Sequence, residues 1–135
     1  MTLRQTLSKS ERLKSYKRIR ILFAQGQKFK VFPLVVYFLL SDDEVGGVLQ
    51  MGVSVGKRHF KRAVDRNLLK RRIREAYRKK KGELKETLTA SGISMDIFFV
   101  YSNARISDYA EIELAMQQGL TILLEKIKTK TPKTE

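Results

Sequence analysis

The chain has 135 residues, 42% of them hydrophobic, which favours a single folded domain and excludes a disordered tail. It contains no cysteine and no apolar run typical of a membrane span or a signal peptide, so we expect a cytoplasmic protein without disulfides or thiolate-bound metals. The net charge of +14 indicates a polyanionic partner, either nucleic acid or an anionic membrane surface.

The first helix is predicted over Tyr16–Gln25. Its apolar residues recur at helical spacing on one stripe: Ile19, Leu22 and Phe23. Ser15 is the expected N-cap, because its hydroxyl would accept a hydrogen bond from the first turn. Gly26 is expected to end the helix in the left-handed conformation.

Three strands are predicted after this helix, from β-branched and aromatic runs separated by Pro33 and by an acidic turn. They cover Lys28–Phe32, Leu34–Leu40 and Val48–Val55. The third strand alternates between large apolar residues and the small or polar Gln50, Gly52 and Ser54. Its polar face is either exposed to solvent or the floor of a groove, and alternation alone does not decide between the two.

A basic helix follows the strands. The segment from Lys57 to Lys81 contains thirteen Lys and Arg residues and two acidic ones, so it carries +11 of the net charge. One arc of the predicted helix is apolar and is expected to pack on the sheet: Ala63, Leu69, Ile73, Ala76 and Tyr77. Because nearly all the remaining charges have one sign, they lack the acidic i, i+4 partners of an ordinary solvated helix. A rigid surface of one sign favours nucleic-acid binding.

The last third of the chain is expected to add one strand and one helix. We predict a loop over 83–94 with a short helical turn at Glu83–Leu88, and then a strand at Met95–Tyr101. A final helix is predicted over Asp108–Lys126 with Ser107 as its N-cap. Its buried stripe consists of Ile112, Met116, Leu120, Leu123 and Ile127.

The element order α-β-β-β-α-β-α favours a two-layer α+β domain with one sheet covered by helices. We expect this single domain to span residues 15–128. Residues 1–14 are expected to form a frayed basic N-terminus, and residues 129–135 a disordered tail.

The side chains do not form a recognisable catalytic site. His59 is the only histidine and lies in the basic run, where a nucleic-acid contact or a plain surface position is favoured over catalysis. The consecutive acids Asp42, Asp43 and Glu44 are typical of a turn and do not converge as the ligands of a metal ion would. The glycines before Lys57 do not have the spacing of a P-loop.

The stretch VSVGKRHFKRAVDRNLLKRRIREAYR resembles the signature of the bacterial ribonuclease P protein subunit. That signature is a strand ending in V-S/T-V-x-K-K/R, a helix beginning A-V-x-R-N, and then K-R-x-x-R-x-x-[FY]. The matching residues are Lys57, Arg58, Ala63, Val64, Arg66, Asn67, Lys70, Arg71, Arg74 and Tyr77. The stretch ERLKSYKRIRILFAQG is similar to the opening of the family, and the likeness covers about residues 11–127.

The resemblance implies that the catalyst is an RNA, and that the protein binds this RNA and the 5′ leader of precursor tRNA. It implies that Mg²⁺ bound chiefly by the RNA activates the water. The implied fold is a two-layer sandwich with one four-stranded sheet, of the ribosomal-protein-like kind. A left-handed β-α-β crossover surrounds the basic helix in that fold, against the usual right-handed rule. The expected partners are therefore the catalytic RNA and precursor tRNA, with no membrane and no DNA.

Two RNA-contacting surfaces are implied by the family. Phosphates and sugars of the catalytic RNA would meet the residues of the basic helix that match the motif: Lys57, Arg58, Arg66, Asn67, Lys70, Arg71 and Arg74. Charge alone adds Arg62 and Arg78. The single-stranded leader would stack in a groove between the first helix and one sheet face, at Ile19, Phe23, Tyr37 and Ser54. This implication favours a groove floor on the polar side of the third strand.

Three positions depart from the family pattern. Leu68 stands where a third basic residue often follows Arg-Asn, so one phosphate contact is lost. Ile19 stands where the family commonly has Phe, so a stacking platform is lost and the expected affinity for the leader falls. Ser102 follows the last strand where the family commonly has a basic residue.

Other classes of function stay open on the residues alone. Composition and charge also fit a structural RNA-binding protein of the ribosome or an RNA chaperone, which would have no need for Phe23, Tyr37 and Ser54 on one surface. A sequence-specific DNA binder would have a short helix just before the basic one, where a strand is predicted. A membrane-surface helix is disfavoured, because the apolar stripe is used for the core.

Overall fold

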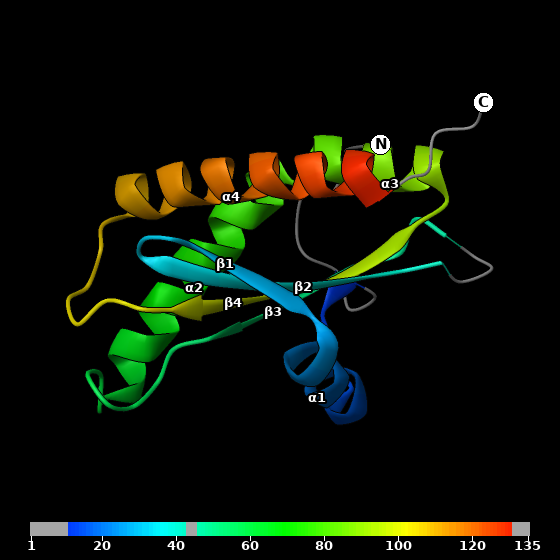
Figure 1. The fold of residues 1–135 in the computed structure, drawn as a ribbon. Helices are drawn as coiled ribbons and strands as arrows, with labels where there is room; N and C mark the ends of the chain where they lie inside the picture. Colours follow the sequence, from blue (N-terminus) through cyan, green and yellow to red (C-terminus); the bar gives the residue numbers. More distant parts are fainter. Residues whose placement is uncertain (1–10, 43–45, 131–135) are drawn as a thin grey trace, which may run out of the picture.

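The computed structural model describes residues 11–42 and 46–130, which form four helices and one four-stranded sheet (Figure 1). In chain order the elements are α1 (Tyr16–Gln25), β1 (Gln27–Val31), β2 (Leu34–Ser41), β3 (Leu49–Ser54), α2 (Ala63–Lys80), α3 (Gly82–Ser91), β4 (Ser94–Tyr101) and α4 (Tyr109–Lys130). The α+β class and the order predicted from the sequence are confirmed, with α3 as an addition.

The sheet has the strand order β1-β2-β4-β3. The pairs β1/β2 and β2/β4 are antiparallel, whereas β3 and β4 are parallel. Because parallel neighbours need a crossover connection, α2 and α3 lie between β3 and β4 in the chain. The chain therefore returns after its basic helix to place β4 in the middle of the sheet, between β2 and β3.

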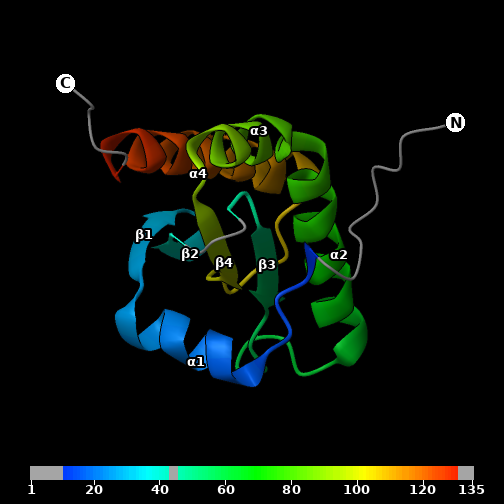
Figure 2. The same ribbon diagram turned by 90° about the vertical axis from the view of Figure 1, so that its right-hand side faces the viewer.

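The helices lie on both faces of the sheet. In Figures 1 and 2, α3 and α4 lie on one side and α1 crosses the opposite side. The core lies under α2, α3 and α4, where alternate residues of β2 and β4 are buried, among them Phe38, Ile97 and Phe99. The predicted stripe of the last helix is confirmed, since each of its five residues is buried. Among the described residues, α1 and the segment just before it lie over the other face, where the Leu13 carbonyl oxygen comes within 3.6 Å of a Cβ at Gly52. Part of that face stays accessible, since Phe23 is 42% exposed.

The helix α3 replaces the loop that was predicted with a short helical turn. Lys81 keeps right-handed helical torsions, φ −74° and ψ −13°, so α2 passes into α3 without an extended linker. Leu84 and Leu88, one turn apart, are both buried in the core. Gly92 ends the helix in the left-handed conformation, with φ +69°. The predicted loop is wrong because Leu84 and Leu88 stabilise a helix by their burial, whereas the other residues of α3 show no clear apolar periodicity.

The chain ends differ from the prediction wherever they are described. The Leu13 N–H donates to the Met51 carbonyl over 2.8 Å, and Arg12 forms a parallel bridge with Met51. Glu11 pairs with Lys81. The expected fraying is therefore wrong for residues 11–13, which are attached to the edge of β3, and residues 1–10 lie outside the described part. At the other end, α4 continues to Lys130, and only residues 131–135 of the expected tail lie outside it.

Of the two predicted N-caps, one is confirmed and one is wrong. Ser15 caps α1 as expected, since its Oγ accepts from the Arg18 N–H at 3.3 Å. The cap of α4 is Asp108 instead of Ser107, because Asp108 Oδ1 accepts from the Glu111 N–H at 2.9 Å. Ser107 is buried, and its hydroxyl lies 2.8 Å from that of Tyr101.

Gly26 does not adopt the left-handed conformation, since its φ is −76° and its ψ 170°. Glycine is required there for space: a Cβ would lie 2.5 Å from the Leu22 carbonyl oxygen and 2.7 Å from that of Phe38. Both contacts are to backbone atoms, so α1 or β2 itself would have to shift to make room for a side chain. We expect Gly26→Ala to lower the free energy of unfolding by about 2 kcal/mol or more.

Chemical denaturation measures this effect, with Gly82→Ala as the matched control. Gly82 starts α3, and a Cβ there would meet no atom within 4 Å. The control should gain a few tenths of a kcal/mol, up to about 1 kcal/mol, from helix propensity. Equal stabilities of the two variants would show that α1 and β2 separate readily at Gly26.

Tyr77 carries a buried hydroxyl for which the described residues offer no hydrogen-bond partner. Its ring packs edge-to-face on Phe99, with centroids 5.9 Å apart, and burial followed by the charge of Glu11 raises the pKa of the phenol. Because an unpaired buried hydroxyl costs about 1 kcal/mol or more, Tyr77→Phe should raise the free energy of unfolding by roughly that amount. Thermal and urea unfolding measure the difference, and a loss of stability would instead reveal a partner for the hydroxyl.

Candidate nucleic-acid interface

The exposed side of α2 and the loop before it carry the predicted cationic surface. The apolar arc faces the core through Leu69, Ile73, Ala76 and Tyr77, as expected, whereas Ala63 at the start of the helix is exposed. Six of the predicted contact residues are exposed: Lys57, Arg58, Arg62, Asn67, Arg71 and Arg74. Three are half-buried: Arg66, Lys70 and Arg78. The helix therefore presents most of the predicted set to solvent on one rigid element.

The two acids of α2 pair with the residues that were added from charge alone. Arg62 lies 3.3 Å from Asp65, and Arg78 lies 2.5 Å from Glu75. The hydrogen bond from Arg78 lowers the pKa of Glu75, so this carboxylate stays ionised at neutral pH. Arg62 and Arg78 are therefore partly neutralised, and the motif residues carry most of the unbalanced charge.

Arg66 has an internal role that the sequence did not indicate. Its Nη1 donates to the carbonyl oxygens of Phe60, at 2.7 Å, and Lys61, at 2.9 Å. These bonds fasten the loop between β3 and α2, which holds Lys57 and Arg58. Arg66 therefore positions two predicted contact residues as well as being one itself.

Two further arginines bear on this surface. Arg72 turns inward, because its Nη1 donates to the Ser107 carbonyl over 2.6 Å and ties α2 to the start of α4. Arg12 lies near Arg74, whose pKa is lowered first by burial and then by the charge of Arg12. Sequence reasoning missed Arg12 because it placed residues 1–14 in a frayed segment. Two arginines at one place favour an anionic partner more strongly than either alone.

Aromatic rings gather on the sheet face that α1 crosses. The Phe23 ring lies 4.5 Å from that of Tyr37 and 5.1 Å from that of Phe98, both edge-to-face. Tyr37, Phe98 and Gly52 are neighbours across β2, β4 and β3. A Cβ at Gly52 would lie 2.7 Å from the Phe98 ring, so glycine leaves room for that ring over β3. Phe23, Tyr37 and Phe98 together form an aromatic cluster.

The cluster contains two of the four residues predicted to bind the leader. Phe98 was missed, because the apolar pattern of its strand did not show which side chains face α1. Phe23 is 42% exposed, so a base can reach its ring. Ile19 is half-buried one turn earlier on α1. Ser54 lies two residues beyond Gly52 on the same face of β3, at the edge of a separate pocket.

An ion pair fixes α1 over this face. Arg18 donates to Asp96 of β4 through Nη2, at 2.7 Å, and Nε, at 3.2 Å. Asp96 is only 7% exposed, so the pair is shielded from solvent on the acid's side. A two-point contact of a planar guanidinium with a carboxylate restricts rotation as well as distance. It thereby sets where Phe23 lies relative to Tyr37.

The departures from the family pattern have structural consequences. Leu68 is half-buried on α2, so no charge replaces the missing basic residue there. Ser102 donates its N–H to the Pro33 carbonyl over 2.7 Å, which joins the end of β4 to the turn before β2. Within the described residues, no three His, Asp or Glu side chains gather as a metal site would require, and no helix is long and apolar enough to cross a bilayer.

The fold and these two surfaces define a class: a small basic α+β protein with the cationic helix and exposed stacking rings that nucleic-acid-binding proteins use. The family described as Ribonuclease P matches residues 7–126 of the chain. The chain therefore belongs to the ribonuclease P protein family, and the resemblance seen in its sequence is confirmed.

Relatives and solved structures agree with this membership. The ribonuclease P protein component of Porphyromonas gingivalis is 37% identical over 129 residues, which cover 96% of this chain and 94% of that protein. The ribonuclease P protein component of Ligilactobacillus salivarius is 31% identical, and the match covers 84% of this chain and 98% of that protein. The Staphylococcus aureus RNase P protein shares the fold with a TM-score of 0.67 at 24% identity, over 85% of this chain and 96% of that one. The RNase P protein of Thermotoga maritima gives a TM-score of 0.51 at 21% identity, over 93% of this chain and 98% of that one.

Proposed function

We propose that this chain, the protein component of an endoribonuclease, binds the catalytic RNA of ribonuclease P through α2 and the 5′ leader of precursor tRNA through the aromatic cluster. Binding would promote endonucleolytic removal of the leader to give the mature tRNA 5′ end. One observation carries the proposal: an accessible cluster of three rings lies on the sheet face whose strand β3 leads directly into the cationic loop and helix.

The chemistry of the two surfaces suits two different RNA forms. Arginine pairs with phosphate through two parallel hydrogen bonds, and the Asn67 amide both donates and accepts, as a phosphate and a 2′-hydroxyl require. These groups on α2 fit a folded RNA with a dense backbone. Stacking on Phe23 or Tyr37 needs an unpaired base, so the aromatic cluster fits a single-stranded leader.

The reaction itself is assigned to the RNA. In this proposal Mg²⁺ is held mainly by the RNA, as the family resemblance implies, and no step is assigned to the chain's own carboxylates. The protein supplies affinity and position for the substrate. We place this activity in the cytoplasm, where bacterial precursor tRNA is made.

Cleavage of a precursor tRNA at low Mg²⁺ tests the proposal. Three reactions are compared: a bacterial ribonuclease P RNA alone, the protein alone, and the two together. We expect cleavage at the mature 5′ end only in the mixture. If the protein binds RNA tightly but adds no cleavage, the role is that of a structural RNA-binding protein or an RNA chaperone.

A further inference from the structure

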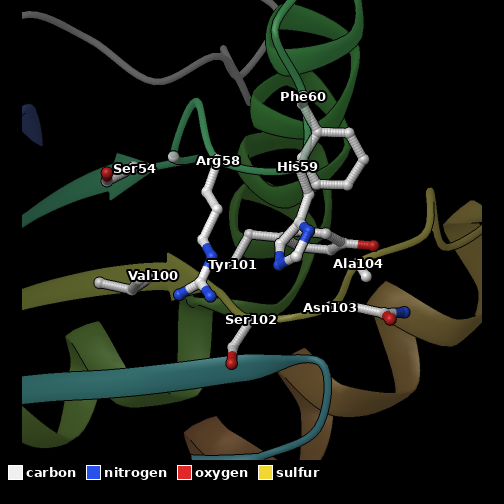
Figure 3. A pocket seen from close by; sticks show the side chains of 10 residues that line it. Ser54, Arg58, His59, Phe60, Val100, Tyr101, Ser102, Asn103 and Ala104 are labelled. Atoms are coloured by element: carbon white, nitrogen blue, oxygen red, sulfur yellow. The ribbon is translucent and has the colours of Figure 1, made fainter.

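A pocket of about 340 Å³ lies at the carboxyl ends of the parallel strands β3 and β4. The loop between β3 and α2 forms one wall, and the loop between β4 and α4 forms the other. In Figure 3 the Arg58 and His59 side chains reach from the first loop toward the end of β4, where Ser102 and Asn103 lie. Ser54 lies at the border toward the sheet. The family signature includes neither His59 nor Asn103.

Both walls are held in place before any ligand binds. Phe60 is 7% exposed, and its ring lies 5.8 Å from that of Tyr101, so the first loop is packed on the end of β4. The two hydrogen bonds from Arg66 hold the carbonyl oxygens of Phe60 and Lys61. On the other wall, Asn103 Nδ2 donates to the Ser107 hydroxyl at 3.1 Å. A ligand would therefore meet preorganised groups, which lowers the entropic cost of binding.

The lining has the chemistry that recognises a nucleotide. No acidic side chain lines the pocket, whose residues all belong to the described part of the chain, whereas Arg58 supplies a guanidinium for a phosphate. The imidazole of His59 and the guanidinium of Arg58 are flat groups on which a base stacks. Ser102 and Asn103 supply hydroxyl and amide groups at the opposite wall for the edge of a base. The volume lies within the usual range of small-ligand sites.

The pocket continues the surface of the aromatic cluster. Ser54 pairs with Val100, two residues beyond the pair of Gly52 and Phe98 along the same strands. Two residues of a strand advance by about 7 Å, roughly the spacing of nucleotides in an extended single strand. A leader that stacks on Phe23 therefore reaches the pocket with a nearby nucleotide.

We propose that this pocket binds one unstacked nucleotide of single-stranded RNA, with its base against His59 and its phosphate at Arg58. The inference rests on the proposed function, since it adds a further subsite for the leader. His59 is the residue that distinguishes it, because Arg58 also belongs to the surface predicted to bind the catalytic RNA. His59 is exposed, so its replacement leaves the core intact.

The test uses the protein assembled with ribonuclease P RNA and precursor tRNAs whose leaders grow by one nucleotide at a time. Affinity should rise in steps as successive nucleotides reach their subsites. We expect His59→Ala to remove one step and to weaken binding of the longest precursor about fivefold or more, whereas His59→Phe keeps the step because it keeps a flat ring. Lys61→Ala is the matched control, since it removes a cation from the same loop outside the pocket and should change affinity equally at every length.

The outcomes separate this inference from the proposed function. If the affinity of His59→Ala matches that of the wild type at every leader length while Phe23→Ala loses its own step, the pocket does not bind the leader. The aromatic cluster then remains the leader-binding surface. A His59→Ala loss that is equal at all lengths also overturns the pocket, because the contact would then be with the RNA subunit or the tRNA body. If neither variant loses a step, the leader-binding function itself is wrong.

Discussion

Replacing Arg71 and Arg74 together with alanine is expected to weaken binding of the catalytic RNA about 100-fold, because each exposed guanidinium would lose a charge-assisted bond to phosphate. Both side chains are exposed on α2, and neither forms an ion pair with another described residue. Burial and then the nearby charge of Arg12 lower the pKa of Arg74, but a guanidinium stays protonated in proteins, so this side chain is charged at neutral pH. The affinity lost when Arg71 and Arg74 are both replaced is therefore expected to be mainly electrostatic.

The salt dependence of binding measures this contribution separately from shape. If the helix neutralises about five phosphates, log affinity should fall with log salt at a slope on the order of −4, and the double variant should reduce that slope by about 2. Lys128→Ala on α4 is the control, because it removes an exposed cation from another helix. An unchanged slope in a folded double variant would place the RNA interface away from α2. Arg66→Ala is less informative, since it also releases the loop before the helix.

Phe23→Ala is expected to weaken binding of precursor tRNA about 10-fold or more while leaving mature tRNA unaffected, because mature tRNA has no leader to stack. The ring is 42% exposed and meets Tyr37 and Phe98 edge-to-face, so the variant also loses some packing. We expect a loss of about 1–2 kcal/mol in the free energy of unfolding. Binding should therefore be compared at a temperature where both proteins are fully folded.

Tyr16→Ala is the matched control for this effect. Tyr16 is another aromatic residue of α1, 75% exposed, with Arg20 stacked 5.7 Å from its ring centre and outside the aromatic cluster. Its loss should change neither precursor nor mature tRNA binding. Equal losses for precursor and mature tRNA in Phe23→Ala would mean that the ring supports the fold or the RNA subunit and not the leader.

Local patterns predicted the elements of this protein well. The bounds of α1 are those expected, and the strands shift by about one residue at their ends. The core side of α2 follows from an apolar arc at helical spacing, and that of α4 from a stripe of five residues. These features depend on residues three or four positions apart, and the sequence displays such neighbours directly.

Long-range contacts account for the corrections. Gly26 is needed for its closeness to Phe38, and Arg18 reaches Asp96 across 78 positions of the chain. Phe98 joins the aromatic cluster only because β4 lies between β2 and β3 in the sheet. None of these pairs leaves a periodic signal, because the two partners lie on different elements whose pairing is set by packing.

The identity and spacing of nearby residues were enough to predict the family, the order of the elements, and the basic helix with its one-sided charge. The packing of the folded chain sets which basic residues face solvent and which, like Arg66 and Arg72, bond to backbone carbonyls of the protein. Packing also brings Phe23 against Tyr37 and Phe98, and places His59 and Asn103 in the lining of one pocket (Figure 3). Charge and periodicity are properties of a segment, whereas a binding surface is made where segments distant in the chain are packed together.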